Sequence, residues 1–143
     1  MMRTIKTSAR HGSSTLEFVL VLPILLMLSF GLADYGYFFY VKHTLQGAAE
    51  AGVRAGVTPT ATNSAVNAII SSKMTAAGLN NSGYLVTLSP TDVSTAASGA
   101  NVTVTVSVPW GNVSFHALPV SFGGISDGKS VTGAAVMMKE PAN

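Results

Sequence analysis

The chain has 143 residues, which is room for one modest domain and an appendage. Only 10% of the residues are charged and none is cysteine, which excludes disulfide bonds, thiolate metal sites and cysteine nucleophiles. Three basic residues precede Gly12 without an acidic one, whereas the rest of the chain carries five basic and six acidic residues. The basic character therefore belongs to the N-terminal leader. We expect no binding to nucleic acid, because no basic patch with interleaved aromatic residues is present.

A long apolar segment follows the leader. Residues 18–33 carry no charge, Asp34 interrupts the run, and residues 35–41 resume it. A helix over residues 18–41 would be about 36 Å long, enough to cross a hydrocarbon core of about 30 Å. The basic leader predicts a cytoplasmic N-terminus and an extracytoplasmic remainder.

The alternative for this segment is a cleaved secretory signal, since Gly31 and Ala33 offer small residues for a cleavage site. Three observations favour a retained anchor instead. The run is long for a signal, Glu17 lies at its entrance, and the aromatic residues of 35–40 continue past the possible site, as the belt at a membrane interface would. We therefore expect a single-pass membrane helix.

Two features concern the geometry of this helix. Pro23 has no N–H to donate to the carbonyl one turn earlier, so a kink is expected there. Helical character is predicted to continue beyond the membrane, with Gly52 and Gly56 at the spacing that lets another backbone approach closely. This face of small residues packs either on another helix or on the protein's own domain. The Thr58-Pro59 pair then ends the helix.

The rest of the chain predicts one short helix and about three strands. Apolar residues at helical spacing indicate a helix over 62–77. Residues 101–108 alternate between valine on one side and Thr or Ser on the other, which predicts a strand with one wet face and hence an antiparallel sheet. Weaker patterns predict strands over 84–89 and 131–139.

The predicted fold class is therefore α+β. A long N-terminal membrane-spanning helix precedes a small domain with a short helix and about three antiparallel strands. The predicted organisation is a basic leader, an N-terminal transmembrane helix, and an extracytoplasmic α+β domain, with bounds 1–12, 13–57 and 58–143.

Other motifs carry little chemistry. Residues 123–130 match the phosphate-loop pattern G-x-x-x-x-G-K-S, but too few residues follow Ser130 to build a nucleotide-binding α/β domain. We interpret the match as a glycine-rich turn before the last strand and expect no nucleotide. His11, His43 and His116 are too scattered for a shared metal site. No hydroxyl has the His and acid partners of a nucleophile, so no cofactor, metal or catalytic activity is expected.

Glu17 is the most informative candidate site residue, because a carboxylate at the edge of an apolar run is costly in lipid unless something pairs with it. It is either solvated at the level of the lipid headgroups or paired with a cation. If the chain were cut after Gly12, Ser13 would carry a free α-amine at position i relative to Glu17 at i+4. The same amine could approach Glu17 of a neighbouring molecule, and such pairing would set the stagger of an assembly.

These residues resemble a known group. The basic leader, His11-Gly12 and the segment 13–18 resemble a prepilin processing site of the type IV kind. More specifically, the segments Leu16-Glu17-Phe18-Val19-Leu20-Val21-Leu22-Pro23 and Phe30-Gly31-Leu32-Ala33-Asp34-Tyr35-Gly36 resemble the TadE-like family. These are pilin-like proteins of the Tad (tight adherence) system, which builds Flp pili. The small-residue stretch 48–55 and the tail 131–140 are also similar to parts of such proteins.

The resemblance implies a substrate of a membrane prepilin peptidase that cuts between Gly12 and Ser13, which makes Glu17 the fifth mature residue and the assembly carboxylate. It also implies a minor pilin or pseudopilin, because major Flp pilins are much shorter and carry tyrosine where Phe18 stands. Implied partners are this peptidase, other Tad pilins and assembly-platform proteins. The implied location is the bacterial inner membrane, and the implied role is in adhesion and biofilm formation. The alternative is an unprocessed, membrane-anchored binding or scaffold module of the cell envelope.

Overall fold

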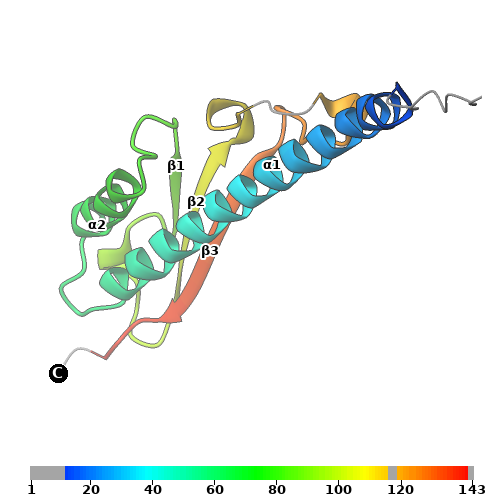
Figure 1. Ribbon diagram of the computed structural model, residues 1–143. Coiled ribbons are helices and arrows are strands. Elements are labelled where there is room, and N and C mark those ends of the chain that lie inside the picture. Colours follow the sequence, from blue (N-terminus) through cyan, green and yellow to red (C-terminus); the bar gives the residue numbers. More distant parts are fainter. Residues whose placement is uncertain (1–11, 116–118, 142–143) are drawn as a thin grey trace, which may run out of the picture.

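The computed structural model describes residues 12–115 and 119–141 (Figure 1). The basic leader up to His11 lies outside these residues, as does His116. The described part contains two α-helices, a three-stranded sheet and short 3-10 turns, which confirms the predicted α+β fold. The helices and strands are α1 (Gly12–Gly56), α2 (Asn63–Ala76), β1 (Leu85–Ser89), β2 (Asn101–Pro109) and β3 (Ser130–Met138).

The long helix α1 has 45 residues and continues through Pro23 without ending. The kink expected at Pro23 stays a prediction. Downstream of the proline, the Ser29 hydroxyl donates to the carbonyl of Leu25 at 2.8 Å, one turn earlier. The C-terminal half of α1 lies across the sheet, while its N-terminal end projects beyond the strands (Figure 1).

The sheet has the strand order β1-β2-β3, and both neighbouring pairs are antiparallel. The central strand β2 alternates between fully buried valines and partly exposed polar residues, as its sequence pattern predicted. The buried side of β2 faces α1 and α2, so a single layer of helices covers one side of the sheet. The helix α2 begins after Thr62, whose hydroxyl accepts a hydrogen bond from the N–H of Ala65 at 3.2 Å.

The hydrophobic core unites the second half of α1 with the domain. Leu45 and Val53 of α1 are fully buried together with residues of α2 and β2. Gly133 of β3 lies so close to the α1 backbone at Leu45 and Gln46 that a Cβ atom there would clash with it. The division of helix from domain at residue 57 stays a prediction, but the core draws on both sides of it.

The Gln46 side chain ties α1 to the outer edge of the sheet. Its amide nitrogen donates to the carbonyl of Ala134 at 3.0 Å, and its amide oxygen accepts from the N–H of Ala134 at 3.2 Å. Because β3 is an edge strand, these two bonds occupy backbone groups that would otherwise be open for pairing with another chain.

A buried lysine joins the end of α1 to the end of β3. The Lys139 ammonium donates to the carbonyls of Gly56 and Val93 at 3.3 and 3.0 Å. Gly56 is the last residue of α1, so the cation lies where the helix dipole favours positive charge. The backbone N–H of Glu140 adds a 2.9 Å bond to the carbonyl of Val57.

The segment between β2 and β3 returns toward the N-terminal end of α1. It contains two 3-10 turns, η2 (Trp110–Asn112) and η3 (Val120–Phe122), and η3 lies beside the blue part of α1 in Figure 1. The residues that match the phosphate-loop pattern form the irregular connection from Gly123 to the start of β3, with Gly123 at a φ of 93°. The predicted glycine-rich turn before the last strand therefore describes this segment correctly.

Candidate functional site

The first half of α1 exposes its apolar side chains on all sides. The most apolar 18-residue window of the segment Ser14–Gly56 has a mean hydropathy of 2.4 and no residue buried within the protein. Leu20, Leu28 and Leu32 are each more than 60% exposed. A helix of this length and composition can cross a hydrocarbon core. No other helix in the described ranges 12–115 and 119–141 has these properties.

The candidate processing and assembly residues lie together at the start of this exposed half. Gly12 and Ser13 are the first residues of α1, and Glu17 is exposed one helical turn after Ser13. The i to i+4 spacing places the backbone positions of Ser13 and Glu17 on the same side of the helix. The roles of these three residues stay predictions.

The glycines expected to mediate helix packing lie at the opposite end of α1. Gly52 is about 52 Å along the helix axis from Glu17, so the structure does not bring the two groups of site residues together. A Cβ atom on Gly52 would be 2.8 Å from the Cδ1 atom of Ile70 in α2, and one on Gly56 would be 3.4 Å from a methyl group of Val102 in β2. Of the two alternatives, the structure therefore has this face packing on the protein's own domain.

The two halves of α1 meet at a small aromatic cluster. The ring of Phe38 packs edge-on against Trp110 with 5.3 Å between centroids, and the ring of Tyr37 lies 4.3 Å from that of Phe115. The Tyr40 hydroxyl donates to the carbonyl of Ala77 at 3.2 Å. These aromatic residues were expected to form a membrane-interface belt, which stays a prediction; Tyr37 and Phe38 also contact the domain.

This contact starts inside the segment that hydropathy assigned to the membrane. Asp34 is only 3% exposed and Val41 is fully buried, both by residues of the domain, whereas Ala33 is exposed. The predicted span of 18–41 thus overlaps the domain over its last two turns. Hydropathy could not separate the two environments, because lipid and a protein core both favour apolar side chains.

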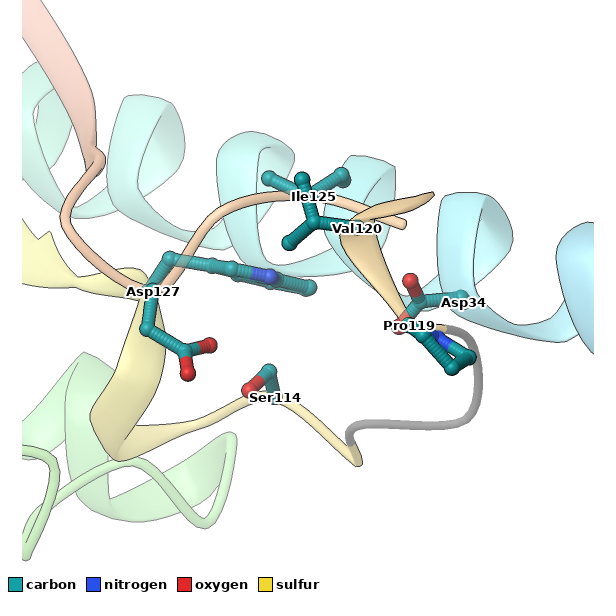
Figure 2. A pocket seen from close by; sticks show the side chains of 7 residues that line it. Asp34, Ser114, Pro119, Val120, Ile125 and Asp127 are labelled. Carbon is teal, nitrogen blue, oxygen red and sulfur yellow. The ribbon is translucent and has the colours of Figure 1, made fainter. Parts of the chain in front are cut away.

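A cavity of about 210 Å³ lies at this junction, and sequence reasoning did not find it. The Oδ1 atom of Asp34 and the Nε1 atom of Trp110 are buried there without a hydrogen-bond partner among the described residues. Figure 2 shows the Asp34 carboxylate directed from α1 into the space bounded by Pro119 and Val120, with Asp127 and Ser114 across the cavity.

The cavity can accommodate a group that both donates and accepts hydrogen bonds. The Asp34 oxygen is an acceptor and the Trp110 indole N–H is a donor, and water or a small polar molecule would satisfy both. An ionisable residue beside a membrane segment commonly faces such a polar space rather than lipid. The only signal in the sequence was the interruption of the apolar run by Asp34.

A helix with an exposed apolar half, joined through this junction to an α+β domain, fits a single-pass membrane protein. Residues 12–54 match the family model described as TadE-like protein, which confirms the resemblance predicted from the sequence. This match covers nearly all of α1 and indicates a protein associated with the Tad pilus. No curated protein and no solved structure matches the chain significantly.

Proposed function

We propose that this protein is a prepilin-like component required for assembly of Tad/Flp pili and acts there as a minor pilin or pseudopilin in surface adhesion and biofilm formation. The supporting observation is the pairing of a TadE-like match over residues 12–54 with a helix whose most apolar 18-residue window has no residue buried in the protein. An apolar helix of this kind can rest in lipid before assembly and pack against other subunits afterwards. The role is structural, and we propose no catalytic activity.

In this proposal a membrane prepilin peptidase cuts between Gly12 and Ser13 on the cytoplasmic side of the inner membrane. The new α-amine of Ser13 then has the carboxylate of Glu17 within reach, in the same chain or in a neighbour. A charge pair in a low-dielectric environment is strong and geometrically specific, so it can set the position of one subunit relative to the next. Other Tad pilins and the assembly-platform proteins are the proposed partners.

N-terminal sequencing and intact-mass measurement of protein extracted from piliated cells test the processing step. We expect the mature chain to begin at Ser13. A Gly12→Leu variant should keep the leader, while Gly47→Ala is the matched control, because a Cβ on Gly47 meets no atom within 4 Å. A wild-type protein that keeps Met1 in cells with an active peptidase would contradict the proposal and favour the unprocessed envelope module.

The variant Glu17→Gln tests the assembly carboxylate, because it removes the charge and preserves the shape of the side chain. We expect loss of pili, counted by electron microscopy, with an unchanged amount of protein in the membrane. Glu50→Gln is the matched control, since Glu50 is an exposed carboxylate on the domain half of the same helix. Normal piliation by Glu17→Gln would refute the assembly role of this residue.

A further inference from the structure

The 3-10 turn η3 and the residues that flank it, 119–124, lie against the apolar half of α1 rather than against the domain core. A groove of about 420 Å³ separates this turn from the helix, and its walls are Met27, Leu28, Gly31, Leu32 and Tyr35 of α1 with Phe122 and Gly123 of the turn. The Tyr35 hydroxyl donates to the carbonyl of Gly123 at 3.1 Å and fastens the turn to the helix. Figure 1 shows the turn alongside the blue part of α1, beyond the ends of the strands.

The position of these helix residues determines the depth of the turn in a membrane. A hydrocarbon core of about 30 Å takes up about 20 helical residues. If the spanning segment begins at Leu16, it therefore reaches about Tyr35, and any tilt of the helix moves this limit further along α1. Met27 and Leu28 then lie inside the membrane, and the turn beside them lies at the same depth.

The side chains of the turn suit this depth. Val120 and Phe122 are 62% and 61% exposed, and the nearby Phe115 is 66% exposed. From residue 113 to residue 126 the sequence has no Asp, Glu, Lys or Arg. Apolar side chains gathered on a protein surface indicate a contact with another apolar phase, and this patch is continuous with the exposed apolar surface of α1.

The backbone of the turn is also prepared for a medium without water. The N–H groups of Phe122 and Gly124 both donate to the carbonyl of Pro119, and that of Gly123 donates to the carbonyl of Val120, at 2.9 to 3.1 Å. Pro119 has no N–H to satisfy, and the carbonyl of Gly123 accepts from Tyr35. Unpaired backbone groups are costly in lipid, so these bonds lower the cost of insertion for the groups that they pair.

We propose that residues 119–124 form a second membrane contact, in which Val120 and Phe122 insert into the lipid of the outer leaflet beside α1. The partner is the bilayer itself. With two contact points instead of one, the domain is held at a fixed tilt over the membrane, and the turn separates Asp34 from the acyl chains. This inference depends on the membrane position of α1 and not on pilus assembly, so it can fail or succeed independently of the proposed function.

Site-directed spin labelling tests the proposal directly, because the chain has no cysteine and each single-cysteine variant carries one label. The full-length variants Phe122→Cys, Leu32→Cys and Met138→Cys are labelled and reconstituted in phosphatidylethanolamine–phosphatidylglycerol vesicles. Leu32 and Met138 are matched controls, 69% and 66% exposed, one on the apolar half of α1 and the other at the far end of β3. Power saturation compares access to oxygen, which concentrates in lipid, with access to a water-soluble nickel chelate.

We expect the oxygen-to-nickel accessibility ratio at Phe122 to match that at Leu32 and to exceed that at Met138. A ratio at Phe122 equal to that at Met138 would overturn the proposal. A ratio at Leu32 as low as that at Met138 would also overturn it, because α1 would then not lie in lipid at this depth. Dipolar broadening at Phe122 that disappears on dilution with lipid would also overturn it, since the patch would then contact a second copy. The near-UV circular dichroism of the single Trp110 verifies folding, and Val120→Cys replaces Phe122→Cys if that variant does not fold.

Discussion

The two halves of α1 have the same secondary structure and similar apolar content but opposite surroundings. Leu25 in the first half is 48% exposed, and Leu45 in the second half is fully buried. The second half differs because β3, β2 and α2 pack on it, and the close approach at Gly133 and the paired bonds of Gln46 hold the sheet there. Hydropathy therefore measures how strongly a helix avoids water and not which apolar environment it enters.

The largest expected effect comes from a substitution that disrupts the packing of β3 on the second half of α1. Gly133→Ala places a methyl group against the α1 backbone at Leu45 and Gln46, where no side-chain rotation can relieve the clash. We expect a loss of more than about 4 kcal/mol of domain stability, measured by thermal unfolding in detergent micelles with Trp110 circular dichroism. Gly47→Ala is the control, and it should stabilise α1 by up to about 1 kcal/mol. Equal stability of the two variants would contradict the close packing of β3 on α1.

The next prediction compares the halves through one substitution made in each. Leu45→Ala removes a fully buried side chain and should cost about 2–5 kcal/mol of domain stability. Leu25→Ala should leave the unfolding midpoint of the domain unchanged, because this residue contacts no part of the domain core. Chemical denaturation of the two variants in the same micelles provides the measurement. A large loss from Leu25→Ala would mean that the first half of α1 also supports the domain.

Much of this fold could be predicted because its patterns are local. The alternating valines of β2 predicted a strand within one residue of its observed bounds, and the helical spacing in 62–77 predicted α2, which the structure bounds at Asn63–Ala76. The exposed end of α1 followed from its apolar run. The position along α1 at which this exposure ends could not be predicted. It depends on where Trp110 and its neighbours, which are distant in the sequence, pack against the helix.

The same reason explains why the cavity was missed. Asp34 was visible as a break in the apolar run, but its burial depends on Pro119, Val120 and Trp110 from the segment between β2 and β3. That segment has no helical or alternating pattern, so its path could not be derived. In contrast, Gly12, Ser13 and Glu17 form a short contiguous motif, which can be found without any knowledge of the tertiary structure.

A smaller effect concerns the end of the buried half. Lys139→Met removes the ammonium that binds the carbonyls of Gly56 and Val93 and leaves both carbonyls buried without this donor. We expect a loss of about 1–3 kcal/mol, measured by chemical denaturation. Lys73→Met is the control, since Lys73 is exposed on α2 and its replacement should change stability little. If the two variants lost the same amount, the bonds of Lys139 would not contribute to holding the end of α1.

The smallest expected effect is a pH dependence of domain stability that arises from Asp92, near Lys139. The hydroxyl and the backbone N–H of Ser94 donate to the Asp92 carboxylate at 2.8 and 2.9 Å, and these bonds, with a smaller contribution from Lys139, lower the pKa of Asp92. A carboxylate whose pKa is lower in the folded state than in the unfolded chain stabilises the protein above the unfolded pKa of about 3.9. This stabilisation is lost as the pH falls through the lower folded value.

We therefore expect wild type to melt slightly above the variant Asp92→Asn at pH 7 and the difference to shrink toward pH 3, because the amide side chain of the variant keeps an acceptor for the Ser94 N–H but has no charge to lose. Thermal unfolding of both proteins across this pH range is the measurement. A difference that stayed constant with pH would show that charge on Asp92 does not contribute. Asp92 adjoins Val93, whose carbonyl accepts from Lys139 near the C-terminal end of α1. A difference that shrinks toward pH 3 would therefore show that a charge-dependent contact stabilises the domain beside the buried end of α1.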